Sequence, residues 1–335
     1  MQKWIDVLKY NPIKHLLESQ NRPIIYFTKR DLENKKVPLI NEIWNLPEVK
    51  NIINKQQNNG SWRYTGKKAN LYPPHHYPMV ETFKKFRTFV EKYELNKTND
   101  SCRKAAEYIF SCQTPKGDFR GMIGNQYATY YTGYFISLLI KAGYKDDKRI
   151  KNGLDWLLDM RQDDGGWTIP ILTHYFDKGT GYKLTSEKVD PVEPDRTQPF
   201  SHNWTNMVLR GFAEHPSYRL KPEIKKAATL MKSRFFQKDY YNSYKSGYYW
   251  VRFGFWWPNL LTALDSLYKI GFTLNDKDII HGIRWFLTHQ QRDGMWNIEN
   301  NPNKKTKEEN KKSKERRLWL TLNICRLLKN FYKKS

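Results

Sequence analysis

A short pattern recurs along the chain, and it constrains the fold more than any other feature of the sequence. Each copy consists of a glutamine, a polar turn that contains glycine, and a large aromatic residue. The copies occupy residues 56–62, 113–119, 162–167 and 290–296. Self-similarity at a period of about 50 residues is the signature of stacked or closed arrays of similar units. The chain is therefore predicted to be a repeat protein.

Two kinds of helix are predicted to alternate around these copies. The stretch before Gln162 places Ile150, Leu154 and Leu157 on one face, which is the spacing of an amphipathic helix. The stretches that follow the copies are apolar on nearly every side and cover residues 130–140, 204–212, 255–267 and 318–328. A helix that is apolar all round is buried, and these stretches are shorter than the ~20 residues that cross a bilayer. Each unit is therefore predicted to pair an outer, half-wetted helix with an inner, dry one.

The expected fold is all-α, with about five helical hairpins in two concentric layers. Residues 1–45 are expected to form an N-terminal helical cap, and residues 46–335 the repeat domain. A degenerate copy of the repeat is expected between residues 237 and 250. Two segments interrupt the period: a long insertion at residues 169–200, and a lysine-rich stretch at residues 300–317 that is expected to be a loop.

The net charge of +24, from 58 basic and 34 acidic side chains, raises the question of an acidic partner. The lysines are scattered over predicted helix surfaces, and no nucleic-acid-binding motif is present, so a nucleic-acid partner is not expected. Peripheral contact of the dense basic run at residues 304–317 with an acidic membrane stays open. The first ten residues lack the apolar core of a secretion signal, and the cysteines form no disulfide framework. A cytoplasmic location is expected.

The repeats resemble those of squalene–hopene cyclases and of protein prenyltransferase β subunits. The resemblance extends over about residues 45–330 and implies the α/α toroid, a ring of inner helices inside a ring of outer ones. In that family the glutamine amide binds backbone groups at helix ends and stacks on the aromatic ring. The matching pairs here are Gln57 with Trp62, Gln113 with Phe119, Gln162 with Trp167, and Gln291 with Trp296. Residues 22–28 also resemble an uncharacterised, single-domain prokaryotic branch of the terpenoid cyclase and prenyltransferase superfamily.

The chain departs from the family at the motifs that carry its chemistry. The Asp-x-Asp-Asp acid of the cyclases does not occur in the sequence. Asp100 and Cys102 have the spacing of two zinc ligands of the prenyltransferases, but they lie at the start of a predicted outer helix. A zinc site needs three converging protein ligands. No metal and no cofactor are therefore expected.

The resemblance implies a ligand cavity on the axis of the ring, at the end where the inner helices begin. Most of the residues expected there are aromatic, and the candidates are Tyr130, Tyr131, Trp204, Arg252, Trp256, Trp257, His75 and His76. Such rings suit an apolar, isoprenoid-like ligand, and each ring face can stabilise a carbocation by ~2 kcal/mol or more when dry. The alternative is that the rings only fill the core.

The insertion supplies the candidate acid–base groups. Glu193 and Asp195 lie in its proline-rich second half, and His202 follows at the start of the next inner helix. Near an apolar cavity, a carboxyl group could have a raised pKa and act as an acid. The alternative is a solvated lid whose charges have no chemical role.

Three functions are compatible with these observations. The first is a terpenoid cyclase-like or prenyltransferase-like protein that binds an isoprenoid or another apolar ligand, with acid–base catalysis by Asp195, Glu193 or His202. The second is a non-catalytic binding or scaffold member of the toroid superfamily. The third is a carbohydrate-active enzyme that uses paired carboxylates. Fold alone does not separate them.

Overall fold

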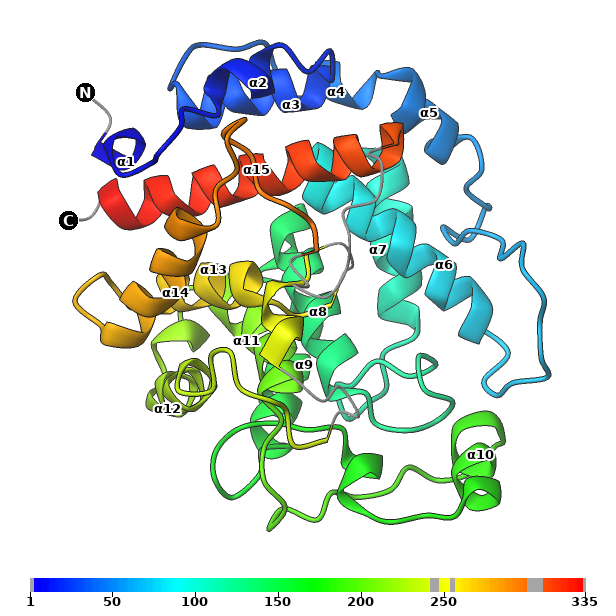
Figure 1. The fold of residues 1–335 in the computed structure, drawn as a ribbon. Helices are drawn as coiled ribbons and strands as arrows, with labels where there is room; N and C mark the ends of the chain where they lie inside the picture. Colours follow the sequence, from blue (N-terminus) through cyan, green and yellow to red (C-terminus); the bar gives the residue numbers. More distant parts are fainter. Residues whose placement is uncertain (1–2, 242–246, 254–256, 300–309, 334–335) are drawn as a thin grey trace. The chain divides into compact units, whose positions relative to one another are not determined.

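The computed structural model describes residues 3–241, 247–253, 257–299 and 310–333 (Figure 1). These residues form helices joined by turns and isolated β-bridges, with no β-strand among them. The predicted all-α class is therefore confirmed. The chain divides into a central unit, Ile40–Leu230, and a terminal unit made of Met1–Leu39 and Met231–Ser335.

The central unit contains three pairs of helices. The first helices of the pairs are amphipathic: α5 (Pro47–Ile53), α7 (Asp100–Ser111) and α9 (Lys148–Asp159). The second helices are α6 (His76–Arg87, extended by the π-helix η2, Thr88–Lys92), which is amphipathic too, and the two apolar helices α8 (Thr129–Leu139, extended by η3, Ile140–Tyr144) and α11 (His202–Glu214). The remaining elements are α4 (Asn41–Trp44), η4 (Pro170–Thr173), α10 (Lys178–Ser186), η5 (Tyr218–Leu220) and the start of α12 (Pro222–Lys232). Nearly every residue of α8 and α11 is buried, as their sequences predict.

Helices α8 and α11 lie side by side in the core of the central unit (Figure 1). Two glycines face each other where the helices meet. A Cβ on Gly133 would lie 2.6 Å from the Cα of Val208, and one on Gly211 would lie 2.7 Å from the carbonyl oxygen of Gly133. Because only glycine leaves this space, the two backbones can touch, and the core is built around that contact.

The terminal unit joins the two ends of the chain. Its elements are α1 (Lys3–Asp6), α2 (Ile13–Leu17), α3 (Arg22–Phe27), η1 (Thr28–Leu32), η6 (Gly247–Val251), α13 (Leu260–Ile270), α14 (Lys277–Thr288) and α15 (Lys311–Lys333). Asp31 accepts hydrogen bonds at 2.5 and 2.8 Å from Arg326, which ties η1 to α15. The side chain of Arg326 also lies over the ring of Phe27, 4.8 Å from its centroid.

The expectation of a loop up to residue 317 is wrong in its second half. Helix α15 begins at Lys311, seven residues before the predicted start at Leu318. Lysine and arginine are good helix formers, so a basic run can extend an apolar helix into solvent. The first half of the predicted loop, residues 300–309, lies outside the described residues.

The glutamine of each repeat fastens its turn to another part of the chain. Gln113 Nε2 donates to the carbonyl oxygens of Gly117, in its own turn, and of Arg149, in the first turn of α9, at 2.7 and 2.9 Å. Gln162 Nε2 donates to the carbonyl oxygens of Asp195 and Gln198 at 2.7 and 2.9 Å. The predicted backbone-binding role of Gln113 and Gln162 is therefore confirmed.

In the other two copies the prediction is wrong by one residue. Gln56, not Gln57, donates to the carbonyl oxygens of Gly60 and Ser101 at 2.8 and 2.9 Å. Gln290, not Gln291, donates to the carbonyl oxygens of Gly294 and Tyr10, at 2.9 and 2.7 Å. Both copies contain a glutamine doublet, and the sequence does not reveal which member turns inward. The glutamine of the last copy thus binds the N-terminal segment at Tyr10, whereas the glutamine of the first copy binds α7 at Ser101.

Each turn is also hydrogen-bonded to the helix that follows it. The backbone N–H of the closing aromatic donates to a threonine hydroxyl in that helix, at 2.8 to 3.4 Å; the pairs are Trp62 with Thr82, Phe119 with Thr132, Trp167 with Thr205, and Trp296 with Thr321. These buried threonines are a part of the repeat that the sequence analysis missed. In the degenerate copy, Trp250 donates its indole N–H to the carbonyl oxygen of Gln237 at 3.2 Å, and the closing tryptophans of the regular copies likewise donate theirs to backbone carbonyl oxygens.

Candidate functional site

An aromatic cluster lies where α8 and α11 begin. The predicted ligand-binding residues Tyr130 and Tyr131 from α8 and Trp204 from α11 come together there, and Phe83 from α6 completes the cluster. The ring centroid of Tyr130 lies 4.3 Å from that of Tyr131 and 4.5 Å from that of Trp204. The ring centroids of Phe83 and Tyr131 are 5.3 Å apart. Three helices thus contribute to one packed aromatic cluster, in which Phe83, Tyr130 and Trp204 are buried and Tyr131 is half-buried.

The tyrosines of this cluster stay protonated at any physiological pH. Burial raises the pKa of Tyr131 to about 12 and the pKa of Tyr130 well above its ordinary value. Tyr131 is half-buried, whereas Tyr130 and Trp204 are buried. Tyr131 is therefore the most accessible of these three rings.

The insertion at residues 169–200, which we call the strap, is fixed to the loop that leads into α8. Gln126, which is buried, donates to the carbonyl oxygen of Leu184 at 3.0 Å and accepts from the backbone N–H of Val192 at 2.9 Å. Asn125 donates to the carbonyl oxygen of Val189 at 2.8 Å. The strap is therefore held against the rest of the central unit between Leu184 and Val192.

The two strap carboxylates predicted to be catalytic occupy different environments. Glu193 is exposed, and its Oε1 accepts from the Tyr127 hydroxyl at 2.8 Å and lies 3.8 Å from Lys116 Nζ. Asp195 accepts from the Thr197 hydroxyl at 2.6 Å and from Gln198 Nε2 at 3.0 Å. These hydrogen bonds lower the pKa of Asp195, so the expected raised pKa is not found.

The three predicted histidines lie in two places in the central unit: His202 at the start of α11, and His75 and His76 at the start of α6. His202 is buried in the first turn of α11, whose N-cap Ser201 accepts from the backbone N–H of Trp204 at 3.2 Å. His75 and His76 bond to the carbonyl oxygens of Arg120 and Gly121 at 3.3 and 2.7 Å. Burial lowers the pKa of His75, which keeps its ring neutral at physiological pH.

The other predicted ligand residues belong to the terminal unit. Arg252 Nε lies 3.4 Å from Glu299 Oε1, and its guanidinium lies 5.8 Å from the ring centroid of Tyr249. The carbonyl oxygen of Trp257 accepts from Asn259 Nδ2 at 3.1 Å. Trp256 lies outside the described residues.

Sequence reasoning missed a charged group among the apolar helices of the central unit. Glu91 at the end of η2 lies 2.5 Å from Arg210 of α11 and accepts from the Tyr134 hydroxyl of α8 at 2.9 Å. The Arg210 guanidinium lies 3.8 Å from the ring centroid of Tyr134. Burial acts to raise the pKa of Glu91, but the charges of Arg210, Lys141 and Arg87 outweigh it and lower the pKa. Glu91 is thus a stable carboxylate and not a proton donor at neutral pH.

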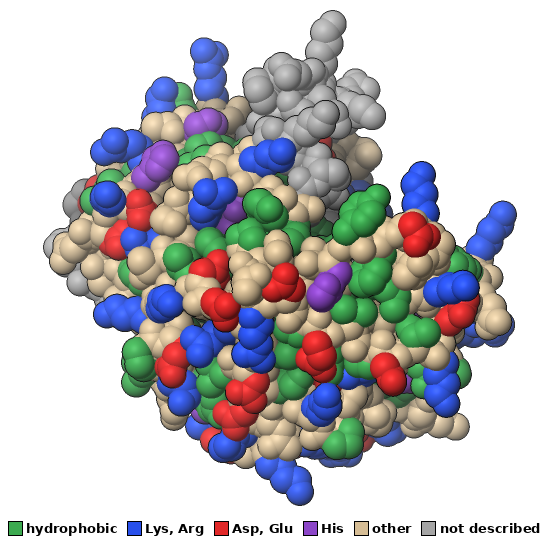
Figure 2. Space-filling view, turned by 90° about the horizontal axis from the view of Figure 1, so that it is seen from below, with side chains coloured by type: hydrophobic (Ala, Val, Ile, Leu, Met, Phe, Trp, Pro, Cys, Tyr) green, Lys and Arg blue, Asp and Glu red, His purple; other side chains and the backbone are tan. Residues whose placement is uncertain are grey.

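Over the described parts of the chain, no three histidine, cysteine, aspartate or glutamate side chains lie close enough to bind a metal ion. None of the described helices is long and apolar enough to span a membrane. Figure 2 shows basic and acidic side chains interspersed on one face of the molecule, so the positive charge does not gather there.

Comparison with known proteins finds similarity to terpenoid cyclases. Residues 76–186 match the model of the squalene-hopene cyclase C-terminal domain. A lanosterol synthase of Aspergillus fumigatus is 28% identical over 165 residues, which are 49% of this chain and 20% of that protein. A terpene cyclase/mutase of Nectria sp. is 25% identical over 158 residues, 47% of this chain and 19% of the relative. The matched segment thus spans about a fifth of each curated relative.

Solved structures give weaker similarities over most of the chain. A protein from Actinoplanes covers 91% of this chain and 89% of its own length, with a TM-score of 0.43 and 12% identity. A type II terpene cyclase from Scytonema, solved with geranylgeranyl dihydroxybenzoate as substrate, covers 88% and 99%, with a TM-score of 0.33 and 13% identity. The family model and the two sequence relatives confirm the resemblance to the terpenoid cyclase superfamily.

Proposed function

We propose that the central unit is a terpenoid cyclase-like binding domain that receives an isoprenoid-like apolar molecule on the aromatic cluster of Phe83, Tyr130, Tyr131 and Trp204. The observation that carries the proposal is the meeting of these four rings at the starts of α8 and α11. Three of the four rings lie inside the segment that matches the squalene-hopene cyclase domain.

The geometry of the rings supports an apolar ligand over a polar one. The hydroxyl groups of Tyr130 and Tyr131 stay neutral, so the cluster presents ring faces and no titrating charge. A prenyl chain gains about 25 cal/mol for each Å² of apolar surface that it buries against such rings. Ring faces would also stabilise any cation that forms on the chain.

Binding without cyclisation is the second candidate, and the state of Asp195 favours it. Cyclisation that begins by protonation needs a carboxylic acid that is still protonated at neutral pH. The hydrogen bonds of Thr197 and Gln198 hold Asp195 in its ionised form, and Glu91 is held ionised by its cations. The acid–base roles of Glu193 and His202 stay predictions. A carbohydrate-active site finds no support in Asp195, whose carboxylate is occupied by its neighbours in the strap.

Native mass spectrometry and solvent extraction of the purified protein test the proposal directly. We expect a co-purifying prenyl compound, or saturable quenching of tryptophan fluorescence when geranylgeraniol is added. The Tyr131→Leu variant should weaken that binding about tenfold, because it removes the most accessible ring of the cluster.

The matched control is Phe110→Leu. Phe110 is also an aromatic residue of the central unit, but it packs against Phe119 and Tyr144, away from the cluster residues named above. The Phe110→Leu substitution should lower the melting temperature and leave the affinity for geranylgeraniol within about twofold of wild type. If geranylgeraniol does not bind, or binds equally well to Tyr131→Leu, the isoprenoid proposal is wrong.

A further inference from the structure

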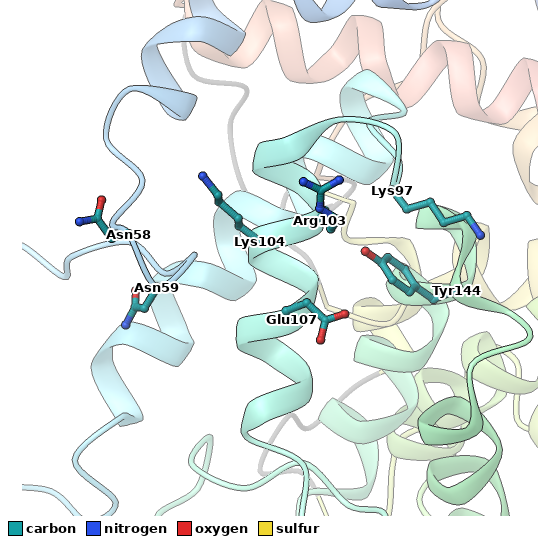
Figure 3. A pocket seen from close by; sticks show the side chains of 7 residues that line it. All are labelled: Asn58, Asn59, Lys97, Arg103, Lys104, Glu107 and Tyr144. Atoms are coloured by element: carbon teal, nitrogen blue, oxygen red, sulfur yellow. The ribbon is translucent and has the colours of Figure 1, made fainter.

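The central unit has an open groove of about 410 Å³ on α7. Its walls come from the first repeat turn, from the segment before α7, from α7 itself and from the end of η3 (Figure 3). The lining residues are Asn58, Asn59, Lys97, Arg103, Lys104, Glu107 and Tyr144. None of them belongs to the aromatic cluster or to the strap. The volume lies within the ~300–1,000 Å³ that small-molecule sites occupy.

The acidic side chains at this groove already have partners. Both oxygens of Asp100 are engaged, one by Arg103 and the other by Lys104 Nζ at 2.9 Å. Glu107 receives two hydrogen bonds from Arg149 of α9, at 2.8 and 3.0 Å. The carboxylates are therefore neutralised.

Hydrogen-bond donors remain available in the groove. The side chain of Lys97 is exposed and makes no ion pair within the described parts of the chain. Arg103 is also exposed and uses one nitrogen on Asp100, which leaves further N–H groups of its guanidinium for another acceptor. Donors thus outnumber free acceptors, as in a site that receives an anion.

Tyr144 adds a donor that the protein itself does not use. Its hydroxyl oxygen is buried and has no hydrogen-bond partner among the described residues. Burial raises the pKa of Tyr144 to about 12, so the group keeps its proton at neutral pH. The ring packs edge-on against Phe110, 5.6 Å away, and its hydroxyl is directed toward the side of α7 that carries Arg103 and Glu107 (Figure 3). A buried donor without an acceptor is costly, and a ligand oxygen would satisfy it.

We propose that this groove binds a small organic oxyanion, a phosphate or a carboxylate. The anionic oxygens would accept from Tyr144 and Arg103, with Lys97 adding charge. The organic part would lie on the Tyr144 ring and on the methylene stems of Lys97 and Lys104. The exposed Arg103 side chain would turn aside to admit an oxygen to the buried Tyr144 hydroxyl. This site is independent of the aromatic cluster.

Calorimetric titration with three probes of similar size tests the inference. Phenyl phosphate and benzoate carry the two oxyanions, and benzyl alcohol is the neutral control. We expect at least one anion to bind at millimolar concentration or below while benzyl alcohol does not. The tighter of the two anions identifies the ligand class. If neither anion binds at that concentration, or if benzyl alcohol binds equally well, the inference is overturned.

Variants distinguish anion binding in this groove from non-specific attraction of an anion by the positive charge of the chain. Tyr144→Phe removes only the unused hydroxyl, so it should leave the melting temperature unchanged or slightly raised and weaken binding about tenfold. Arg103→Gln should weaken it by about tenfold or more. The matched control is Arg292→Gln, an exposed arginine outside the groove, which should stay within about twofold of wild type. Equal affinity of wild type, Tyr144→Phe and Arg103→Gln would also overturn the inference.

Discussion

The repeat turns at residues 113–119 and 162–167 are built alike but are used differently. Each follows an amphipathic helix, and each gives its closing aromatic N–H to a threonine of the next apolar helix. Gln113 reaches α9 and joins two repeat units, whereas Gln162 reaches the carbonyl oxygens of Asp195 and Gln198 in the strap. One turn therefore maintains the array, and the other holds the segment that distinguishes this chain.

The position of the glutamine explains the difference. The backbone N–H of Gln162 donates to the carbonyl oxygen of Gly166, and the N–H of Thr114 makes the same bond to Asp118. Gln162 is thus the counterpart of Thr114 and not of Gln113. Moving the amide by one residue changes the direction in which the side chain leaves the turn, and the strap supplies the carbonyl groups that it meets.

The largest expected effect is on the free energy of unfolding, when the glycines of these two turns are replaced by alanine. Gly117 and Gly165 have φ values of +109° and +104°, so alanine would be strained at both. At Gly117 a Cβ would also lie 2.4 Å from the carbonyl oxygen of Asn152, whereas at Gly165 it would meet only the flexible side chain of Lys226 at 3.2 Å. In urea denaturation, Gly117→Ala should lose about 3 kcal/mol or more of unfolding free energy, and Gly165→Ala about 1 kcal/mol. Equal losses would mean that the contact with α9 is not what requires glycine.

The next prediction concerns which glutamine fastens the first turn. Gln56→Ala removes two hydrogen bonds to carbonyl oxygens and should cost about 2 kcal/mol of unfolding free energy. Gln57→Ala is the control: this side chain is exposed and accepts only from Ser61, so its loss should cost about 0.5 kcal/mol or less. A larger loss for Gln57→Ala would restore the pairing that the sequence suggests.

These turns show how far the sequence determines the fold. The period, the paired helices and the apolar cores of α8 and α11 follow from patterns of apolar residues and glycine, and those patterns act locally. The choice within the doublets at Gln56 and Gln290 depends on which carbonyl groups the neighbouring segment presents, and that is a tertiary property. The role of the threonines is a tertiary property too, because only the structure shows that Thr82, Thr132, Thr205 and Thr321 are buried.

The candidate site was less predictable than the fold. Tyr130, Tyr131 and Trp204 were found because aromatic residues at the starts of the apolar helices are visible in the sequence. Glu91 and Arg210 are 119 residues apart and match no motif, so only the packing of η2 against α11 brings them together. The raised pKa expected for Asp195 was wrong because Thr197 and Gln198, its neighbours in sequence, stabilise the charged form.

A third prediction isolates the strap. Gln162→Ala should cost about 1–2 kcal/mol of unfolding free energy, and it should speed hydrogen exchange locally, over residues 169–200. Gln113→Ala is the matched control, because it also removes two amide–carbonyl hydrogen bonds, one within its own turn and one to the start of α9. It should speed exchange at the start of α9 and leave the strap protected. Faster exchange of the strap in both variants would show that the two turns do not act separately.

The smallest effect is the pH dependence of the strap, which also tests the role of Asp195. Because hydrogen bonds from Thr197 and Gln198 lower its folded pKa, the carboxylate contributes its full stability above the unfolded pKa of about 3.9. That contribution is lost as the pH falls through the folded pKa. At neutral pH, Asp195→Asn should therefore melt slightly below wild type, and the gap should close in acid; melting curves followed by circular dichroism at several pH values measure it. A gap that grows toward acid would mean a raised pKa, the property that an acid catalyst at Asp195 requires, and the preference for binding without cyclisation would then be lost.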